Sequence, residues 1–504
     1  MKFTQEDRDQ ISRHGLTLSE VETQLRCLKD TAHKVKVLRP AVPGDGIRVL
    51  SEDEISQLLR EYPQRMQGKK LLKFVPASGA ATRMFKKWYG FPESLSEDVS
   101  EGLRRDFVRY PFRRQLSEAL KERGLSLETM ETEGQFREIL HFLLASDGLD
   151  FGQLPKGLLP FHVYGEEVRT AFEEHWAEGA AYAAGSDGRV RLHFTVSPAH
   201  EEAFVRLARQ LKTKYASCSG LQFDVRFSCQ QPHTDTVALD ADGQPARHSD
   251  GRLVFRPGGH GSLLHNLNAL DADVVFVKNI DNVTIDALKQ DTITYKQCLA
   301  SLLLRLQQQS FACLRSLDAG ADEFLLAGIE EFLKKELLQV FPGSYACSSF
   351  AEKCACCRRM LNRPLRVCGM VRREKDPGGG PFWVEDSEGK ISLQIVETAE
   401  MDLDDGTQAA LLEASQYFNP VDLVCGWKNY EGEAFDLMRS VDRKRYFTAD
   451  KSLEGKSVRV LEHPGLWNGS MSDWNTVFVA VPLSTFTPVK TVEDLLRPAH
   501  GSRP

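Results

Sequence analysis

The 504-residue sequence lacks the features that mark several large classes of protein. It has no uninterrupted run of about 18 apolar residues, the length that a transmembrane helix needs, so we expect no membrane partner. Its first residues, Met1 to Asp7, contain no apolar stretch of the kind found in secretory signals, which predicts a cytoplasmic protein. Lys and Arg number 64 against 71 Asp and Glu, a net charge of −7. Without a basic excess, we expect no nucleic-acid partner.

Cross-linking by disulfides or metals is not expected either. The eleven cysteines are scattered along the chain and, without a signal sequence, are predicted to be reduced, buried thiols. Cys347, Cys354, Cys356 and Cys357 lie close in sequence, but they lack the paired Cys-x₂-Cys spacing of zinc sites. A chain of this length can bury a core large enough to fold without such cross-links.

The sequence does contain alternating strand and helix patterns. Residues 1–70 are charged and helix-patterned, with a capping box at Ser51–Glu54, and are predicted to form an N-terminal helical cap. From residue 71 onward, short apolar runs alternate with amphipathic segments, which predicts an α/β fold with a mixed, mainly parallel sheet. We expect a main domain over 71–400 and a C-terminal part over 401–504.

Two segments of the main domain are expected to be helical. Residues 85–152 resemble an insert of mixed charge, and 296–340 repeat leucine at helical spacing. Within the insert, Arg104–Arg114 is both basic and aromatic. Such a segment either stacks on single-stranded nucleic acid or forms a solvated helix with one apolar side.

Two loops that follow strand-like runs have the composition of anion sites. In Ala77–Arg83, small side chains would let backbone N–H groups approach an anion, and a helix that follows would add its positive end; a tight structural turn is the alternative. In Leu154–Pro160, Lys156 is fixed between proline and glycine, which suits a point charge that meets phosphate. The alternative for Lys156 is an exposed loop lysine.

Two further segments suggest ligand contacts. The three glycines of Arg256–Ser262 would let the backbone lie flat against a planar base or a sugar. Asp281 follows the buried strand-like run Val274–Val277, and the carboxyl ends of strands are where α/β sheets bind ligands. Its carboxylate either holds Mg²⁺ or caps the next turn.

In this order and spacing, these segments resemble the UDP-sugar pyrophosphorylase family, the nucleotidyltransferases exemplified by UDP-N-acetylglucosamine and UDP-glucose pyrophosphorylases. Pro76–Met84 resembles the family's glycine-rich loop, which ends in Gly-Thr-Arg-Leu, and Phe486–Leu496 resembles its Pro-Val-Lys-Thr motif. The resemblance spans residues 71–496. The other similar segments are Leu154–Phe161, Thr170–His175, Phe194–Ser197, Phe227–Gln231, Arg256–Ser262, Ile280–Asn282, Ile395–Glu400 and Tyr417–Asn419.

The sequence also departs from the family pattern. Ser78 and Ala81 stand where the family has glycines, and His260 stands where it has asparagine. The insert 85–152 replaces a short connection. These changes leave the sugar specificity open and keep two alternatives: a non-catalytic nucleotide- or sugar-binding regulator on the same fold, and a glycosyltransferase.

The resemblance implies a glycosyltransferase-A-like, Rossmann-like fold whose domain 71–400 is catalytic and whose residues 401–504 complete the site. It implies a Mg²⁺-dependent reaction of a sugar-1-phosphate with a nucleoside triphosphate, UTP by preference, that releases pyrophosphate. The sequence makes no prediction of oligomeric state.

The resemblance also implies roles for individual residues. It assigns Arg83, Lys156 and Lys490 to catalysis and Asp281 to the metal. Either Gln230 or Gln231 would read uracil, because a side-chain amide offers both a donor and an acceptor. The residues assigned to the nucleotide are Ser78, Gly79, Ala80, Thr82, Gln230, Gln231, Gly258 and Gly259. Those assigned to the sugar are His260, Asn282, Glu397 and Asn419.

Overall fold

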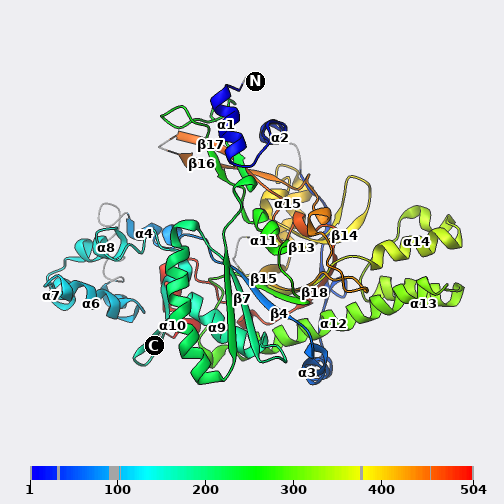
Figure 1. The fold of residues 1–504 in the computed structure, drawn as a ribbon, viewed down its shortest axis with the longest axis horizontal. Coiled ribbons are helices and arrows are strands. Elements are labelled where there is room, and N and C mark those ends of the chain that lie inside the picture. The colour runs from blue at the N-terminus through cyan, green and yellow to red at the C-terminus, as the bar shows by residue number, and fades with distance from the viewer. Residues whose placement is uncertain are drawn as a thin grey trace. The chain divides into compact units, whose positions relative to one another are not determined.

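The computed structural model describes residues 3–30, 34–89, 102, 104–374, 378–453 and 456–501 (Figure 1). The chain divides into two compact units. Unit 1 comprises residues 1–70, 229–276 and 297–481, and unit 2 comprises residues 71–228, 277–296 and 482–504. This division differs from the boundaries expected from the sequence, because each unit gathers segments that are distant along the chain.

The N-terminal seventy residues are helical only in part. Their helices are α1 (Gln5–Arg13), α2 (Leu18–Lys29) and α3 (Glu52–Met66), and their strands are β1 (Lys36–Pro40), β2 (Val42–Pro43) and β3 (Gly46–Arg48). The capping box is confirmed, since Ser51 Oγ accepts from the Glu54 amide at 3.2 Å and Glu54 accepts from the Ser51 amide at 3.0 Å. The expectation of a wholly helical cap is wrong because strand partners come from elsewhere in unit 1, as in the antiparallel pairing of Lys36 with Glu385.

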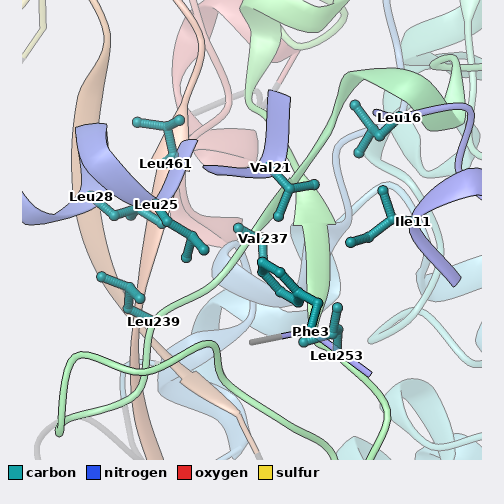
Figure 2. Packing of buried hydrophobic residues seen from close by; sticks show 10 residues of the cluster. All are labelled: Phe3, Ile11, Leu16, Val21, Leu25, Leu28, Val237, Leu239, Leu253 and Leu461. Carbon is teal, nitrogen blue, oxygen red and sulfur yellow. The ribbon is translucent and has the colours of Figure 1, made fainter. Parts of the chain in front are cut away.

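The first two helices are held to unit 1 by an apolar cluster (Figure 2). Val21, Leu25 and Leu28 repeat at helical spacing on α2 and are fully or almost fully buried. They pack with side chains from 237–253 and with Leu461, so the helices join a core that later segments complete. The members of the cluster are Phe3, Ile11, Leu16, Val21, Leu25, Leu28, Val237, Leu239, Leu253 and Leu461.

Unit 1 contains a mixed sheet. Strands run in the order β2-β3-β18-β12-β15; β12 is parallel to β18 and antiparallel to β15. A second, antiparallel sheet has the order β1-β13-β14. The remaining strands are β9 (Asp235–Val237), β10 (Phe255–Pro257), β12 (Leu365–Arg372), β13 (Gly380–Glu385), β14 (Ile391–Val396), β15 (Tyr417–Gly426), β16 (Phe447–Leu453), β17 (Lys456–Glu462) and β18 (Asn475–Ala480). The helices are α11 (Leu264–Asn268), α13 (Glu323–Lys335), α14 (Phe350–Leu361) and α15 (Gly406–Glu413).

Two elements belong to both units by chain position. Strand β11 (Val274–Lys278) begins in unit 1 and ends in unit 2, and helix α12 (Gln290–Asp318) begins in unit 2 and ends in unit 1. Together, α12 and α13 confirm the helical prediction for 296–340.

Unit 2 contains three parallel strands in the order β4-β7-β8, in agreement with the α/β pattern predicted from residue 71 onward. Phe172 of α9 and Phe204 of α10 meet the strands through ring contacts, with 4.5 Å between the centroids of Phe172 and Phe194. The strands are β4 (Leu71–Pro76), β5 (Pro160–Tyr164), β6 (Glu167–Thr170), β7 (Arg189–Thr195) and β8 (Gln222–Ser228). The helices are α4 (Lys86–Tyr89), α6 (Arg113–Glu122), α7 (Leu127–Thr132), α8 (Phe136–Leu144), α9 (Ala171–Tyr182) and α10 (Glu201–Ser219).

The described part of the insert 85–152 is helical, as predicted. Its aromatic residues Phe107, Tyr110 and Phe112 are no more than 4% exposed and make ring contacts with Trp88. Because these rings are buried, they are not available to stack on nucleic-acid bases. The segment Arg104–Arg114 therefore has the second of its two expected roles, a solvated basic surface over an apolar side.

All eleven cysteines are free thiols, as expected. Five of them are buried, four are half-buried, and Cys218 and Cys347 are exposed, so the prediction of buried thiols is confirmed for five and wrong for Cys218 and Cys347. Among the described residues, no three His, Cys, Asp or Glu side chains are grouped in a way that could hold a metal ion. None of the described helices combines the length and apolar character needed to cross a bilayer.

One buried histidine makes unit 2 sensitive to acid. His193 on β7 is 6% exposed, its Nε2 lies 2.8 Å from Ser228 Oγ, and burial together with the charge of Arg226 lowers its pKa to about 4. Between pH 6.5 and pH 4 the unfolded chain binds a proton that the folded chain does not, so stability falls as the pH falls. We expect this residue to cost roughly 3 kcal/mol of unfolding free energy over that range.

The measurement is urea denaturation of wild type and His193→Gln at several pH values, since glutamine does not titrate. As the pH is lowered from 6.5 to 4, wild type should lose roughly 3 kcal/mol more unfolding free energy than His193→Gln. A difference that stays constant from pH 6.5 to pH 4 would show that His193 titrates normally in the folded protein.

Candidate functional site

Four segments that the sequence singled out are joined by backbone hydrogen bonds in unit 2. The loop after β4 meets the lysine loop, because the Lys156 amide donates to Gly79 O at 3.1 Å and Ala80 forms a β-bridge with Pro155. The segment after β11 meets the C-terminal motif, because Asn282 forms a β-bridge with Pro488. These two pairs of segments are joined by the Val492 amide of the C-terminal motif, which donates to Met84 O, at the end of the loop after β4, at 3.1 Å.

The side chain of Lys156 lies at the centre of this group. Its Nζ donates to Asp281 Oδ2 at 2.7 Å and to the carbonyl of Val489 at 2.7 Å. The side chains of Lys156 and Asp281 are 15% and 21% exposed, so the ion pair is partly accessible to solvent. We name Gly79, Lys156, Asp281 and Val489 the lysine–aspartate cluster.

The backbone around Asp281 is firmly held. The amide of Val489 donates to Asp281 O at 3.0 Å, and the buried Asn282 accepts from the Thr487 amide at 2.9 Å. From α9, the buried His175 lies with Nε2 3.1 Å from Ile280 O. Burial keeps the pKa of His175 well below its usual range, so the ring is neutral and its Nε2 donates to that carbonyl.

The loop after β4 presents its backbone to solvent. Ser78, Gly79 and Ala80 are exposed, whereas Ala77 and Ala81 on either side are buried. A Cβ placed on Gly79 would meet no atom within 4 Å, so packing within the protein does not require glycine there. The open space lets an anion approach the backbone of this loop.

The other cationic and hydroxyl residues predicted here lie on the same segments. Thr82 is exposed and donates through Oγ1 to Gly152 O at 3.1 Å, and the neighbouring Arg83 is exposed. Lys490 follows Val489, with its Nζ 5.6 Å from the ring centroid of Phe486. Unit 2 therefore places three cationic side chains on the segments of the lysine–aspartate cluster.

A buried charge cluster lies within unit 2 on elements that lead to this site. Glu178 of α9 contacts Lys73 of β4 through Oε2 and Lys278 at the end of β11 through Oε1, both at 2.7 Å. Burial would raise the pKa of Glu178, but the ammonium groups of Lys278 and Lys73 hold it well below its usual range. Burial also lowers the pKa of Lys73 to about 7, against the attraction of Glu178.

Asp281 has the donor chemistry for Mg²⁺. Magnesium is commonly bound by one or two carboxylates together with substrate phosphates and water, so a single partly exposed carboxylate fits it. Lys156 connects this carboxylate to the exposed loop 78–80, because its Nζ donates to Asp281 Oδ2 and its backbone amide donates to Gly79 O. Asn282 already uses its side-chain oxygen to accept from Thr487.

In unit 1, His260 and Glu397 form a second polar group. The His260 ring stacks on Trp467, with centroids 4.2 Å apart, and its Nδ1 accepts from the Leu466 amide at 3.0 Å. Its Nε2 therefore carries the proton and lies 3.6 Å from Glu397 Oε1. Burial would raise the pKa of Glu397, but the interactions with His260, Asn468 and Trp467 together lower it below its usual range, so Glu397 is ionised at neutral pH.

The glycines of 256–262 are explained in part by close packing. A Cβ on Gly258 would lie 2.4 Å from His463 Cδ2, and one on Gly261 would lie 2.2 Å from Pro464 O. Gly259 has a φ of +77°, which side-chain-bearing residues rarely adopt. This segment therefore needs its glycines to pack on 462–464, whatever ligand it contacts.

The remaining predicted residues in unit 1 are engaged to different degrees. Gln230 donates to Asp235 Oδ1 at 3.1 Å, whereas Gln231 is exposed. Asn419 is buried and accepts from the Val421 amide at 3.1 Å, where Val421 has a φ of +58°. Its own amide donates to Gly379 O, and Gly379 lies against the side chain of Glu397.

Sequence reasoning missed three parts of these groups. The carbonyl of Val489 has no side-chain signal and could not have been found. Trp467 stood in a turn-rich segment that is equally typical of packing, and only the structure stacks it on His260. Lys73 was visible as a charged residue in an apolar run, which indicates a buried partner such as Glu178.

Comparison with solved structures finds low-identity similarity to nucleotide-sugar enzymes. UDP-N-acetylglucosamine pyrophosphorylase from Trypanosoma brucei, in complex with an inhibitor, is 14% identical with a TM-score of 0.47, over 98% of this chain and 79% of that one. UDP-glucose pyrophosphorylase from Leishmania major, in open and closed structures, is 12% identical with a TM-score of 0.45, over 98% and 79%. UDP-glucose phosphorylase from Trypanosoma brucei is 13% identical with a TM-score of 0.46, over 97% and 76%.

At TM-scores below 0.5, these similarities assign neither fold nor activity to this chain. No curated protein sequence matches it. The family model described as "Domain of unknown function (DUF4301)" matches residues 4–501, nearly the whole chain. The protein therefore belongs to the DUF4301 family.

Proposed function

We propose that the protein is a nucleotidyltransferase that joins a sugar-1-phosphate to a nucleoside triphosphate, UTP by preference, and releases pyrophosphate. The observation that carries the proposal is the lysine–aspartate cluster, in which Lys156 contacts Asp281 and Val489. Four sequence segments that resemble pyrophosphorylase motifs meet there, although Gly79 and Val489 are 410 positions apart along the chain. A purely structural turn would not need all four to converge.

The proposed reaction requires two polyanions to be brought together. An oxygen of the sugar phosphate attacks the α-phosphorus in line, the bond from the α-phosphorus to the bridging oxygen breaks, and pyrophosphate leaves with that oxygen. The exposed backbone at Gly79 and Ala80, with Ser78, Thr82 and Arg83, would bind the β- and γ-phosphates. Positioning and charge neutralisation supply most of the acceleration in such reactions.

Lys156 and Lys490 would neutralise the charge that develops around the α-phosphorus. Their ammonium groups are compact point charges with three donors each, which suits phosphate oxygens that move during the reaction. Asp281 would hold Mg²⁺, which when bound would supply positive charge to offset that of the phosphates. The contact of Lys156 with Val489 O keeps the ammonium near Asp281 without using all of its donors.

Unit 1 supplies the residues proposed for the base and the sugar. The ionised Glu397 can accept hydrogen bonds from sugar hydroxyls, and the stacked His260 offers a donor at Nε2. Asn282, which belongs to unit 2, and Asn419 are also assigned to the sugar by the resemblance, but both are buried and hydrogen-bonded within the protein, so they would position neighbouring backbone rather than contact the sugar directly. Gln231, which is exposed, is better placed than the engaged Gln230 to read a base, and Gly258 and Gly259 would lie against it.

The test is pyrophosphate release in the presence of Mg²⁺, with four nucleoside triphosphates crossed against a panel of sugar-1-phosphates. Asp281→Ala should abolish release, and Asp147→Ala, whose side chain is 67% exposed, should leave it unchanged. Release that requires one specific pair would support the proposal and identify the substrates.

Two other outcomes would contradict it. UTP binding without release from any pair would favour the regulator. Release of free nucleoside diphosphate from a nucleotide sugar would favour a glycosyltransferase.

A further inference from the structure

A cavity separate from the lysine–aspartate cluster lies entirely in unit 1. It is lined by residues to which the proposed reaction assigns no role. Its volume is about 540 Å³, within the usual range of small-molecule sites. It is lined by residues from the segment 16–27, which includes most of α2, by His233 and Thr234, and by residues from the segments 261–265, 438–446 and 461–470. These segments come from four distant parts of the chain, so the cavity is a product of the fold.

The polar lining of the cavity is rich in hydrogen-bond donors. Arg443, His233, His265 and His463 all line it. The rings of His233 and His265 meet edge to face, with centroids 4.6 Å apart. Across the described part of the chain, the guanidinium of Arg443 makes neither an ion pair nor a hydrogen bond, although its positive charge is felt by neighbouring groups.

The cavity wall has one carboxylate, and it is already hydrogen-bonded within the protein. Glu20 is the carboxylate on the cavity wall, and its Oε2 accepts from the Thr17 amide at 2.7 Å and from Thr17 Oγ1 at 2.8 Å. These bonds form the capping box of α2, so Glu20 is committed to its own helix. The cavity therefore offers a guanidinium and three imidazoles against one occupied carboxylate.

The electrostatics of the histidines agree with this balance. Burial lowers the pKa of His265, and the nearby His233, His463 and Arg443 lower it further. Burial also lowers the pKa of His463, whose Nε2 lies 2.9 Å from Thr234 O. Positive charge is thus disfavoured at this wall, which is the condition that an anion would relieve.

Beside these groups and several hydroxyl side chains, the lining has an apolar part. Leu16 and Leu461 belong to the cluster of Figure 2 and are buried, and Leu264, Met438 and Val441 add further apolar surface. A ligand that fills the cavity must therefore present an apolar body as well as an anionic group. Inorganic anions alone would leave this surface uncovered.

We propose that this cavity binds a small organic phosphate monoester with an apolar body. The phosphate would face Arg443 and the imidazoles of His233 and His265, and the body would lie against Leu16, Leu264 and Leu461. Phosphate is favoured over carboxylate because its three terminal oxygens can accept from a guanidinium and from two imidazoles at once, whereas a carboxylate has two oxygens. The proposal does not depend on the proposed reaction.

Phenyl phosphate is a suitable probe, and calorimetric titration measures its binding. Titrations use the full chain carrying Lys156→Ala, which removes the central one of the phosphate contacts proposed in unit 2. Arg443→Ala in this background should weaken binding about tenfold or more, because a charge-assisted contact is lost. The matched control is Arg439→Ala, an arginine on the same segment that is 88% exposed and does not line the cavity, and it should leave the affinity within about twofold.

Further arms keep the proposal falsifiable. Val441→Trp should fill the cavity and abolish binding while Arg443 is still present. Benzoate that binds as tightly as phenyl phosphate would overturn the assignment of a phosphate. No binding at millimolar phenyl phosphate, or an equal loss in Arg439→Ala, would overturn the site itself.

Discussion

Replacing Lys156 by methionine is expected to lower kcat/KM for pyrophosphate release by a factor on the order of 10²–10³, which corresponds to about 3–4 kcal/mol of transition-state stabilisation. Methionine keeps much of the side-chain length and removes the ammonium that contacts Asp281 and Val489. The thermal unfolding midpoint should change little, because a partly exposed ion pair contributes only about 1 kcal/mol to stability.

The control is Lys212→Met, which removes an exposed lysine of α10 outside the cluster and should leave both quantities unchanged. A double-mutant cycle with Asp281→Asn separates the two possible roles of the ion pair. If Lys156 served only to neutralise Asp281, the double variant would regain the activity that Lys156→Met loses. We expect the double variant to be at least as inactive as either single variant, and recovery would remove both Lys156 and Asp281 from the proposed chemistry.

The local features of unit 2 were accessible from the sequence because they depend on neighbouring residues. The apolar run Leu71–Val75 followed by small residues predicted β4 and its loop, and the structure has both. In unit 1, the Ser51–Glu54 capping box was likewise a local pattern with a local consequence. Such signals require no knowledge of which distant segments pack together.

The division of the chain could not be predicted in the same way. The Pro-Val-Lys motif near the C-terminus belongs to unit 2 because Val489 bonds to Asp281, a pairing that no periodicity reveals. Strand β1 lies in a region predicted to be helical. Its charged sequence gives no sign that it pairs with the distant strand β13. Tertiary pairing decided both cases, and it overrides local preference where the partner is far away.

The glycines of 256–262 show that a local sequence pattern can also be explained in two ways. Their number suggested an approach to a base or a sugar, yet Gly258 and Gly261 are already needed where the backbone meets His463 and Pro464. Composition cannot distinguish glycine required by a ligand from glycine required by the protein's own chain. Gly79, with open space around its Cα, is the position where the structure itself supplies no packing reason.

The largest effect on stability is expected from Glu178→Gln. Lys73 and Lys278 are no more than 2% exposed, and both contact this one carboxylate at 2.7 Å. Glutamine preserves the shape but leaves two buried lysines without the negative charge, so each must lose its proton or remain charged in a poorly solvated interior. We expect a loss of roughly 3–5 kcal/mol of unfolding free energy, measured by urea denaturation.

Two comparisons test that explanation. Glu202→Gln, an exposed glutamate on α10, should change the unfolding free energy by no more than about 0.5 kcal/mol. The triple replacement Lys73→Met, Glu178→Leu, Lys278→Met removes the three charges that meet at Glu178, and it should recover most of the stability lost in Glu178→Gln, because it also removes the two lysines that Glu178→Gln leaves without their carboxylate. If Glu178→Gln were as stable as wild type, the lysines would have to be neutral in the folded protein, and the cluster would not be held by charge. A triple variant as unstable as Glu178→Gln would instead show that shape and hydrogen bonding, rather than charge, hold β4, α9 and the end of β11 together.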